Sequence, residues 1–356
     1  MNRRTLSYPE KDGGHTAIGR SGPRVRGLVT AILLLTVLFV MDIPYAAAAV
    51  PLRLGIATWI GYLPVYVALK KGFYQKYGLD LKLITFPGDE AVTAFATDSI
   101  DMTGTASATT VALRDHGGAF FKIIMICDMS VGSDGILARN SIKGIADFKG
   151  KRIGVEEFAV SHFFLLQVLD KAGLRESDVT LVNLTPAEAA TAYRVGAVDI
   201  AVTYAPYLRE VNAEVHDGRI IVDSSSMPTA IMDFFLVRGD YLSTHPAAVE
   251  SFVRGTLEGL AFIRGEPREA AAIGAKQMEI SEAQVSADLT GVIIPDLAQN
   301  IDALSNPDSK LYIGVPLERL VTFLESKAQI SSGTHIDVAT MMDATVLEEV
   351  KSSEGK

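Results

Sequence analysis

The chain has 356 residues, of which 48% are apolar and 21% are charged, and its formal net charge is −9. This length predicts two domains with a large buried core, so neither a disulfide nor a metal is needed to stabilise the fold. The acidic balance argues against an extended nucleic-acid-binding surface, and a single cysteine, Cys127, excludes a disulfide framework and a cysteine-based zinc or iron–sulfur site.

The N-terminal segment has the pattern of an export signal. An uncharged apolar stretch, 27–41, follows six basic residues and precedes the alanines at 46–49. This order is typical of a secretory signal peptide, and the stretch is shorter than the ~20 residues of a membrane span. We predict that residues 1–49 are removed, which leaves a periplasmic protein with 27 basic and 39 acidic residues, a net charge of −12. An uncleaved membrane anchor is the alternative.

Strands and helices alternate along the rest of the chain. Helix-start signals stand between apolar runs, for example Pro64 in a first turn and the capping box that begins at Thr185. Such alternation predicts an α/β fold built on mostly parallel sheets flanked by helices. The runs that predict strands are 52–57, 79–86, 100–102, 121–129, 135–138, 152–155, 180–183, 197–203, 220–223 and 234–238.

The loops at the carboxyl ends of these strands are the expected place for a ligand, because helices begin there. They are rich in Gly, Ser, Thr and aromatic residues, which suits a binding crevice better than a catalytic centre. These loops are 58–62, 86–89, 103–107, 156–161, 183–185 and 203–206.

The common catalytic motifs are absent from the sequence. It contains no G-x-S-x-G, no H-E-x-x-H, no G-x-x-x-x-G-K-[ST] and no G-x-G-x-x-G after a strand, and its six histidines are scattered. We therefore expect no catalytic residue, no metal site and no cofactor. Cys127 lies in an apolar run and is expected to be a packed thiol rather than a nucleophile.

Several stretches of the chain resemble the periplasmic substrate-binding proteins of nitrate/sulfonate/taurine-type importers, a family whose wider superfamily includes thiamine-pyrimidine-binding proteins. They read TWIGYLPVYVALKKGFYQKYGLDLKL at 58–83, SIDMTGTASAT at 99–109 and DFFLVRGDYLSTHPAAVESFVR at 233–254, with a longer match over 147–208. Their order and spacing together carry the resemblance.

The resemblance implies a two-lobed fold of the type II periplasmic binding protein class. Lobe 1 would comprise 51–135 and 233–330, and lobe 2 would comprise 136–232. Residues 331–356 would form a C-terminal helix and tail. The chain would cross between the lobes near Gly132–Gly135 and Met227–Asp233, segments with Gly or Pro that suit a hinge.

The resemblance also implies a set of ligand-binding residues. The chain departs from the family pattern at Phe158, where small residues are common, and at Ala205, where a carboxylate is common. The bulky Phe158 and the carboxylates Glu156 and Glu157 at a helix start weigh against an anion. They leave an uncharged or amine-bearing solute open. The implied residues are Thr58, Trp59 and Tyr62 in the first ligand loop, Thr105 and Ser107 in a polar loop, Glu156, Ser161 and His162 at a helix start of lobe 2, the aromatic Tyr204, and Asp233 at the second hinge.

The function that the resemblance implies is solute capture without catalysis. The protein would be a monomer that closes, by hinge motion, on a small polar solute of the nitrate/sulfonate/taurine-like class. It would deliver this solute to an ABC permease in the inner membrane, which works with a separate ATPase. No nucleic-acid partner is expected. Two alternatives stay open: thiamine-pyrimidine precursor binding or a synthase-like enzyme, and a ligand-sensing partner of a membrane receptor. The synthase family uses a cysteine cluster for iron, whereas this chain has one cysteine.

Overall fold

The computed structural model describes residues 49–354, apart from 116–119, 228, 332 and 334–335. The predicted signal peptide lies outside the described residues, except for Ala49. Among the helices that are described, none combines the length and the apolar character that a membrane crossing requires.

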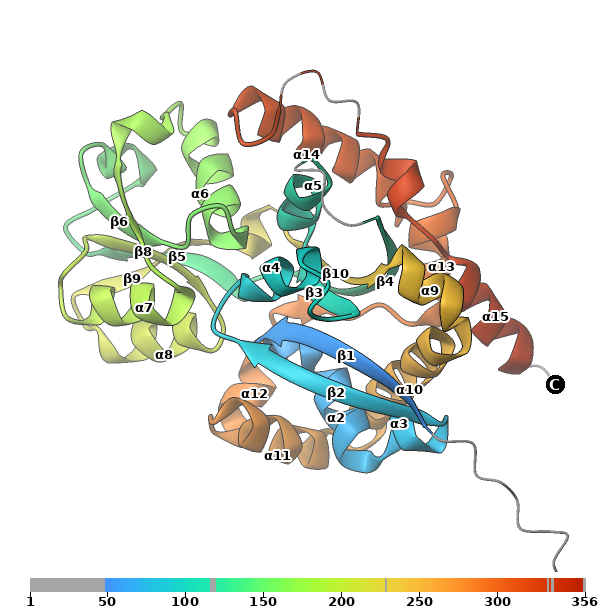
Figure 1. Ribbon diagram of the computed structural model, residues 1–356. Helices are drawn as coiled ribbons and strands as arrows, with labels where there is room; N and C mark the ends of the chain where they lie inside the picture. The colour runs from blue at the N-terminus through green and yellow to red at the C-terminus, as the bar shows by residue number, and fades with distance from the viewer. Residues whose placement is uncertain (1–48, 116–119, 228, 332, 334–335, 355–356) are drawn as a thin grey trace, which may run out of the picture. The chain divides into compact units, whose positions relative to one another are not determined.

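The described strands form two sheets (Figure 1). The first sheet has the strand order β11-β4-β10-β3-β1-β2, and the second sheet has the order β7-β6-β8-β5-β9. The strands are β1 (Val50–Ala57), β2 (Leu79–Phe86), β3 (Met102–Ala106), β4 (Phe121–Ser130), β5 (Asp134–Arg139), β6 (Arg152–Val155), β7 (Thr180–Asn183), β8 (Ile200–Tyr204), β9 (Gly218–Asp223), β10 (Met232–Arg238) and β11 (Val292–Ile293).

Helices flank both sheets. The predicted starts are confirmed at two places: Pro64 lies in the first turn of its helix, and the Thr185 hydroxyl accepts a hydrogen bond from the Glu188 N–H. The α-helices are α2 (Leu63–Lys71), α3 (Phe73–Lys76), α4 (Glu90–Ala96), α5 (Ser107–Asp115), α6 (Val160–Lys171), α7 (Pro186–Arg194), α8 (Tyr207–Glu214), α9 (Gly239–Thr244), α10 (Pro246–Gly265), α11 (Pro267–Met278), α12 (Glu282–Leu289), α13 (Leu297–Ser305), α14 (Gly314–Ser326) and α15 (Thr345–Glu354). The 3-10 helices are η1 (Ile60–Tyr62), η2 (Ile145–Phe148), η3 (Glu176–Asp178), η4 (Ser224–Ser226) and η5 (Val338–Met341).

The α/β class and the two sheets agree with the sequence prediction, but both sheets are mixed rather than mostly parallel. Strands β1, β2 and β3 are parallel, as are β6, β7 and β8. Strand β5 runs antiparallel to β8 and β9, and β10 runs antiparallel to β3 and β4. These two strands are the ones that the chain enters from the other sheet. A strand that is entered at the carboxyl edge of its neighbours must run in the opposite direction.

The predicted bounds of strand β3 lie too early in the chain. Residues 100–102 were predicted as a strand and 103–107 as a loop, whereas the strand spans Met102–Ala106 and helix α5 begins directly at Ser107. Residues Thr103 and Thr105 are buried because β3 is a central strand, hydrogen-bonded to β1 and β10. Polar residues that are buried in a sheet resemble a loop when only the sequence is considered.

The second sheet is covered on both faces by helices that connect its strands along the chain. Phe164 and Leu165 of α6 pack with Ile136 and Val202 on one face. On the other face, residues of α7 and α8 pack with Leu137 and Ala201. Figure 1 shows α6 on one side of this sheet and α7 and α8 on the other. The carboxyl ends of β6 and β8 are left free to contribute to a site.

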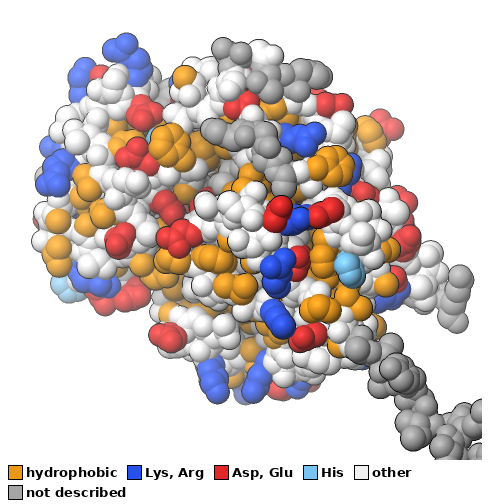
Figure 2. Space-filling view, viewed as in Figure 1, with side chains coloured by type: hydrophobic (Ala, Val, Ile, Leu, Met, Phe, Trp, Pro, Cys, Tyr) orange, Lys and Arg blue, Asp and Glu red, His pale blue; other side chains and the backbone are white. Residues whose placement is uncertain are grey.

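The surface does not display one dominant charge on the face drawn in Figure 2. Acidic and basic side chains are interspersed over it. This face therefore lacks the continuous basic area that a nucleic-acid backbone requires.

Candidate ligand-binding site

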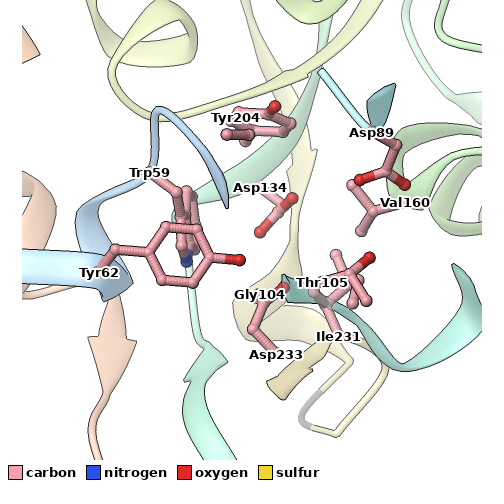
Figure 3. Close-up of a pocket in the computed structure, with 12 residues that line it drawn as sticks. Trp59, Tyr62, Asp89, Gly104, Thr105, Asp134, Val160, Tyr204, Ile231 and Asp233 are labelled. Carbon is pink, nitrogen blue, oxygen red and sulfur yellow. The ribbon is translucent and has the colours of Figure 1, made fainter. Parts of the chain in front are cut away.

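A cavity lies where residues from both sheets meet, with about 360 Å³ of empty space. The lining comes from β1, β3 and β10 of the first sheet and from β5, β8 and the start of α6 beside the second (Figure 3). The lining residues are Ala57, Trp59, Tyr62, Asp89, Gly104, Thr105, Ala106, Asp134, Val160, Tyr204, Ile231 and Asp233.

The loop after β1 is fixed by a buried hydrogen bond. The indole Nε1–H of Trp59 donates to Oδ2 of Asp128 on β4 at 2.9 Å. Gly61 is required beside this pair, because a Cβ there would lie 1.8 Å from the same Asp128 oxygen. Trp59 is 5% exposed and is held with its ring at the cavity wall. The ring therefore forms a preorganised surface rather than a mobile side chain.

Strand β3 supplies a narrow part of the wall. Gly104 faces the Tyr62 ring so closely that a Cβ would lie 2.6 Å from the ring's Cε1 atom. Next to it, the Thr105 side chain is 2% exposed and its hydroxyl has no hydrogen-bond partner in the described part of the chain. The absence of a side chain at 104 thus lets Tyr62 approach the strand, and a polar atom is left free beside it.

The start of β5 and the end of β8 lie side by side in the second sheet. Asp134 opens β5 and is paired with Tyr204, the last residue of β8. The Tyr204 ring contacts Trp59 edge to face, with a centroid distance of 5.6 Å. This contact joins an element of the first sheet to an element of the second. Figure 3 shows the Asp134 carboxylate between Trp59, Tyr62 and Thr105.

Four aspartates gather in and behind the cavity wall. Asp134 and Asp233 are 4% and 8% exposed, Asp89 is half-buried, and Asp128 is fully buried behind Trp59. Burial raises the pKa of Asp134 to about 7 and that of Asp128 to about 6. Burial also raises the pKa of Asp89, and it raises the pKa of Asp233 well above its usual value, with the neighbouring aspartates adding to the latter shift. The desolvation of each carboxylate is the main cause, and none of the residues that line the cavity is a Lys, Arg or His.

Asp89 also connects the two sheets. Its carboxylate accepts hydrogen bonds from the Thr109 hydroxyl at 2.8 Å and from the backbone N–H of Val160. Its own backbone N–H donates to Oε1 of Glu156 at 3.2 Å. Val160 is the first residue of α6, so a carboxylate of the protein itself already occupies the N-terminus of that helix.

The structure brings half of the predicted ligand residues into the cavity wall. Trp59, Tyr62, Thr105, Tyr204 and Asp233 line the cavity. That each of them contacts a solute stays a prediction.

The other predicted residues do not line the cavity. Thr58 is half-buried beside it. The hydroxyls of Ser107 and Ser161 are buried and have no partner among the described residues. Glu156 receives the Asp89 N–H, and burial raises its pKa to about 7. His162 accepts a hydrogen bond from the Phe158 N–H, so its ring stabilises the turn before α6.

The sequence reasoning missed the carboxylates Asp89, Asp128 and Asp134. Asp89 lies in a loop that the strand pattern did mark as a ligand loop, 86–89. Asp134 lies in the first predicted crossing segment, where only glycines were considered. An acidic residue at the start of a strand that follows a crossing is a signal that could have been used, since the carboxyl edges of both sheets meet there.

A larger hollow lies elsewhere, between α6 and α14, with about 1040 Å³ of empty space. Its rim includes Lys171 and Arg319, and its wall includes the apolar Leu320 and Phe323. None of the described buried polar atoms without a partner belongs to its lining. The smaller cavity has two such atoms, on Thr105 and Asp134, and is therefore the better candidate site.

The fold of this chain is shared with solved structures of periplasmic binding proteins. The aliphatic sulphonate binding protein SsuA of Escherichia coli aligns with a TM-score of 0.67 and 20% identity, over 84% of this chain and 99% of that one. The chain therefore has the periplasmic binding protein fold. The sequence model of the NMT1/THI5-like family matches residues 59–270, and the chain belongs to that family.

Curated relatives share this family resemblance at moderate identity. A binding protein of Brucella abortus is 29% identical over 249 residues, which is 67% of this chain and 75% of that protein. The taurine-binding periplasmic protein of Escherichia coli is 27% identical over 176 residues, or 48% of this chain and 53% of that protein. The fold is not restricted to binding proteins, because the desulfurization enzyme DSZB aligns with a TM-score of 0.64 and 16% identity, over 85% of this chain and 99% of that one.

Proposed function

We propose that this protein is the extracytoplasmic solute-binding protein of an ABC importer. The observation that carries the proposal is a cavity lined from both sheets, in which aromatic rings surround buried polar atoms that lack partners. A solute in that cavity contacts both lobes at once. It therefore stabilises their closed arrangement through contacts that an open arrangement lacks.

The names of the relatives support the same class. One relative is named a taurine-binding periplasmic protein, and one structural neighbour is named a periplasmic aliphatic sulphonate binding protein. We propose that this chain likewise acts in the periplasm as a monomer, after removal of residues 1–49, and that it has no nucleic-acid partner. It delivers its solute to a permease in the inner membrane, which a separate ATPase drives.

Capture without catalysis is the second part of the proposal. Cys127 is the only cysteine of the chain, and its thiol donates to the Gly61 carbonyl at 3.3 Å. Burial raises the pKa of this thiol well above its usual value, and the adjacent Asp128 acts in the same direction. A thiol that stays protonated is a poor nucleophile. A synthase of the thiamine-pyrimidine type, with its cysteine cluster, is therefore disfavoured.

The experiment combines identification of a bound solute with a stability screen. Native mass spectrometry of gently purified protein reveals a carried solute, and a thermal-shift screen then compares taurine, alkanesulfonates, nitrate, amines and pyrimidines. A solute at 100 times its Kd adds ~2.7 kcal/mol of stability. The solute must be recovered unchanged. Chemical conversion of the solute, or the lack of any stabilising solute, contradicts the proposal.

The remaining alternative, a ligand-sensing partner of a membrane receptor, is separated by genetics. Deletion of the cognate permease abolishes uptake if the protein serves transport. Uptake that survives this deletion, together with a signalling response that requires the binding protein, favours the sensing function.

A further inference from the structure

We infer that the cavity recognises a small organic cation that carries N–H groups, a primary ammonium or a guanidinium, rather than an anion. The inference rests on the proposed function and specifies its substrate class. Four features of the site support it.

The first feature is the sign of the charges. Asp89, Asp134 and Asp233 line the cavity, and Asp128 lies directly behind Trp59. The lining includes no basic side chain. An anion in this space would oppose the ionisation of these carboxyl groups, whereas a cation would stabilise their ionised form.

The second feature is a set of free acceptors. Oδ2 of Asp134 and the hydroxyl oxygen of Thr105 are buried, line the cavity and have no hydrogen-bond partner in the part of the chain that the structure describes. Figure 3 shows the Asp134 carboxylate and the Tyr62 hydroxyl pointing into the same space. Buried acceptors without partners are costly, and N–H groups of a solute satisfy them.

The third feature is the aromatic wall. Trp59, Tyr62 and Tyr204 line the cavity together with the carboxylates. The faces of aromatic rings attract ammonium and guanidinium groups, most strongly in sites that exclude water. Carboxylates and rings in one wall thus favour the same class of solute.

The fourth feature is the occupation of the helix N-terminus. The start of α6 is the place at which an anionic head would find backbone N–H groups, but the Val160 N–H already donates to the Asp89 carboxylate. The Thr109 hydroxyl, near the start of α5, donates to the same carboxylate. An anionic solute would have to displace Asp89 from both groups.

The spacing of the carboxylates favours an organic cation over a metal ion. In the described residues, no group of three or more His, Cys, Asp or Glu side chains lies close enough together to hold a metal. Asp89, Asp134 and Asp233 instead line one cavity from three separate segments of the chain.

The test uses solutes that share one carbon chain and differ in charge. The mature protein is titrated calorimetrically with propylammonium, propan-1-ol and propanesulfonate, and with guanidinium as a second cation. We expect a cation to bind at least about tenfold more tightly than the alcohol and the sulfonate. Equal or tighter binding of propanesulfonate overturns the inference, and so does the lack of cation binding with a Kd below about 10 mM.

A substitution pair locates the effect in the cavity. Asp134→Asn keeps the shape and removes the charge, and we expect it to weaken cation binding by about tenfold or more. The matched control is Asp80→Asn, the same chemical change at an exposed position of β2. An unchanged affinity in Asp134→Asn contradicts the inference. An anionic solute found tightly bound by native mass spectrometry would overturn the inference of a cationic solute but would still support the proposed solute-binding function. The two proposals can therefore fail separately.

Discussion

Replacement of Asp134 by Asn is expected to make the solute-free protein more stable at alkaline pH. Asp134 is 4% exposed, and burial raises its pKa from 3.8 to about 7. A carboxyl whose pKa is raised by folding destabilises the folded state once the pH exceeds the unfolded value. The penalty grows from about pH 4 and is complete above the folded value.

The size of this penalty follows from the two pKa values. They differ by about three pH units, which corresponds to ~4 kcal/mol at about 1.36 kcal/mol per unit. The Ser130 side chain forms a hydrogen bond with Asp134 that lowers the Asp134 pKa, and the other interacting groups are the acidic Asp128, Asp233 and Tyr204, none of which is a cation. Because the neighbouring carboxyls also take up protons, we expect a net gain of about 2–3 kcal/mol for Asp134→Asn.

The assay is a thermal melt of both proteins between pH 4 and pH 8 without solute. At roughly 2 °C per kcal/mol for a chain of this size, the variant should melt about 4–6 °C higher at pH 8 and at nearly the same temperature at pH 4. Asp80→Asn, at an exposed position, should show no such trend. A variant that is less stable than the wild type at pH 8, or a difference that does not change with pH, would refute the reasoning.

Three further predictions concern the cavity wall and its neighbours. Trp59→Phe keeps an aromatic ring but removes the hydrogen-bond donor to buried Asp128. The free energy of unfolding, measured with denaturant, should therefore fall by about 1–3 kcal/mol at pH 8 and by less below pH 5. An equal loss at both pH values contradicts this prediction. Gly88→Ala would place a Cβ 2.2 Å from Oε1 of Glu156, which lies in the segment predicted as the other lobe. Because the Glu156 carboxylate can move, we expect solute affinity to fall severalfold with little change in melting temperature, whereas the control Gly144→Ala, which meets nothing within 4 Å, should change neither. Equal affinities of Gly88→Ala and the wild type would show that the contact between Gly88 and Glu156 is not needed for closure. The buried Cys127 thiol should react with an aromatic disulfide reagent only after denaturant is added, and rapid reaction of the native protein would show that the thiol is accessible.

Part of the site was accessible to sequence reasoning. Trp59, Tyr62, Thr105, Tyr204 and Asp233 were predicted as ligand residues, and all five line the cavity. The family resemblance implied these residues. Each stands at or near the carboxyl end of a strand or at a crossing, and such positions converge in this fold.

The residues predicted to bind the solute from the start of α6 do not lie in the cavity wall. The family resemblance implied that Glu156, Ser161 and His162 contact the solute from a helix-start loop, but none of them lines the cavity. Asp89, some 70 positions earlier in the chain, accepts the first N–H of this helix. No local pattern reports a contact between such distant segments.

The sequence by itself determined the alternation of strands and helices, the helix caps and the family, because these depend on local periodicity and on the order of short motifs. Only the tertiary structure decided which polar groups meet. It set β5 and β10 antiparallel to their neighbours, and it brought Asp89, Asp134 and Asp233 from three separate segments to one cavity. The charge of that cavity depends on desolvation and on distances between remote segments, and a linear sequence contains neither.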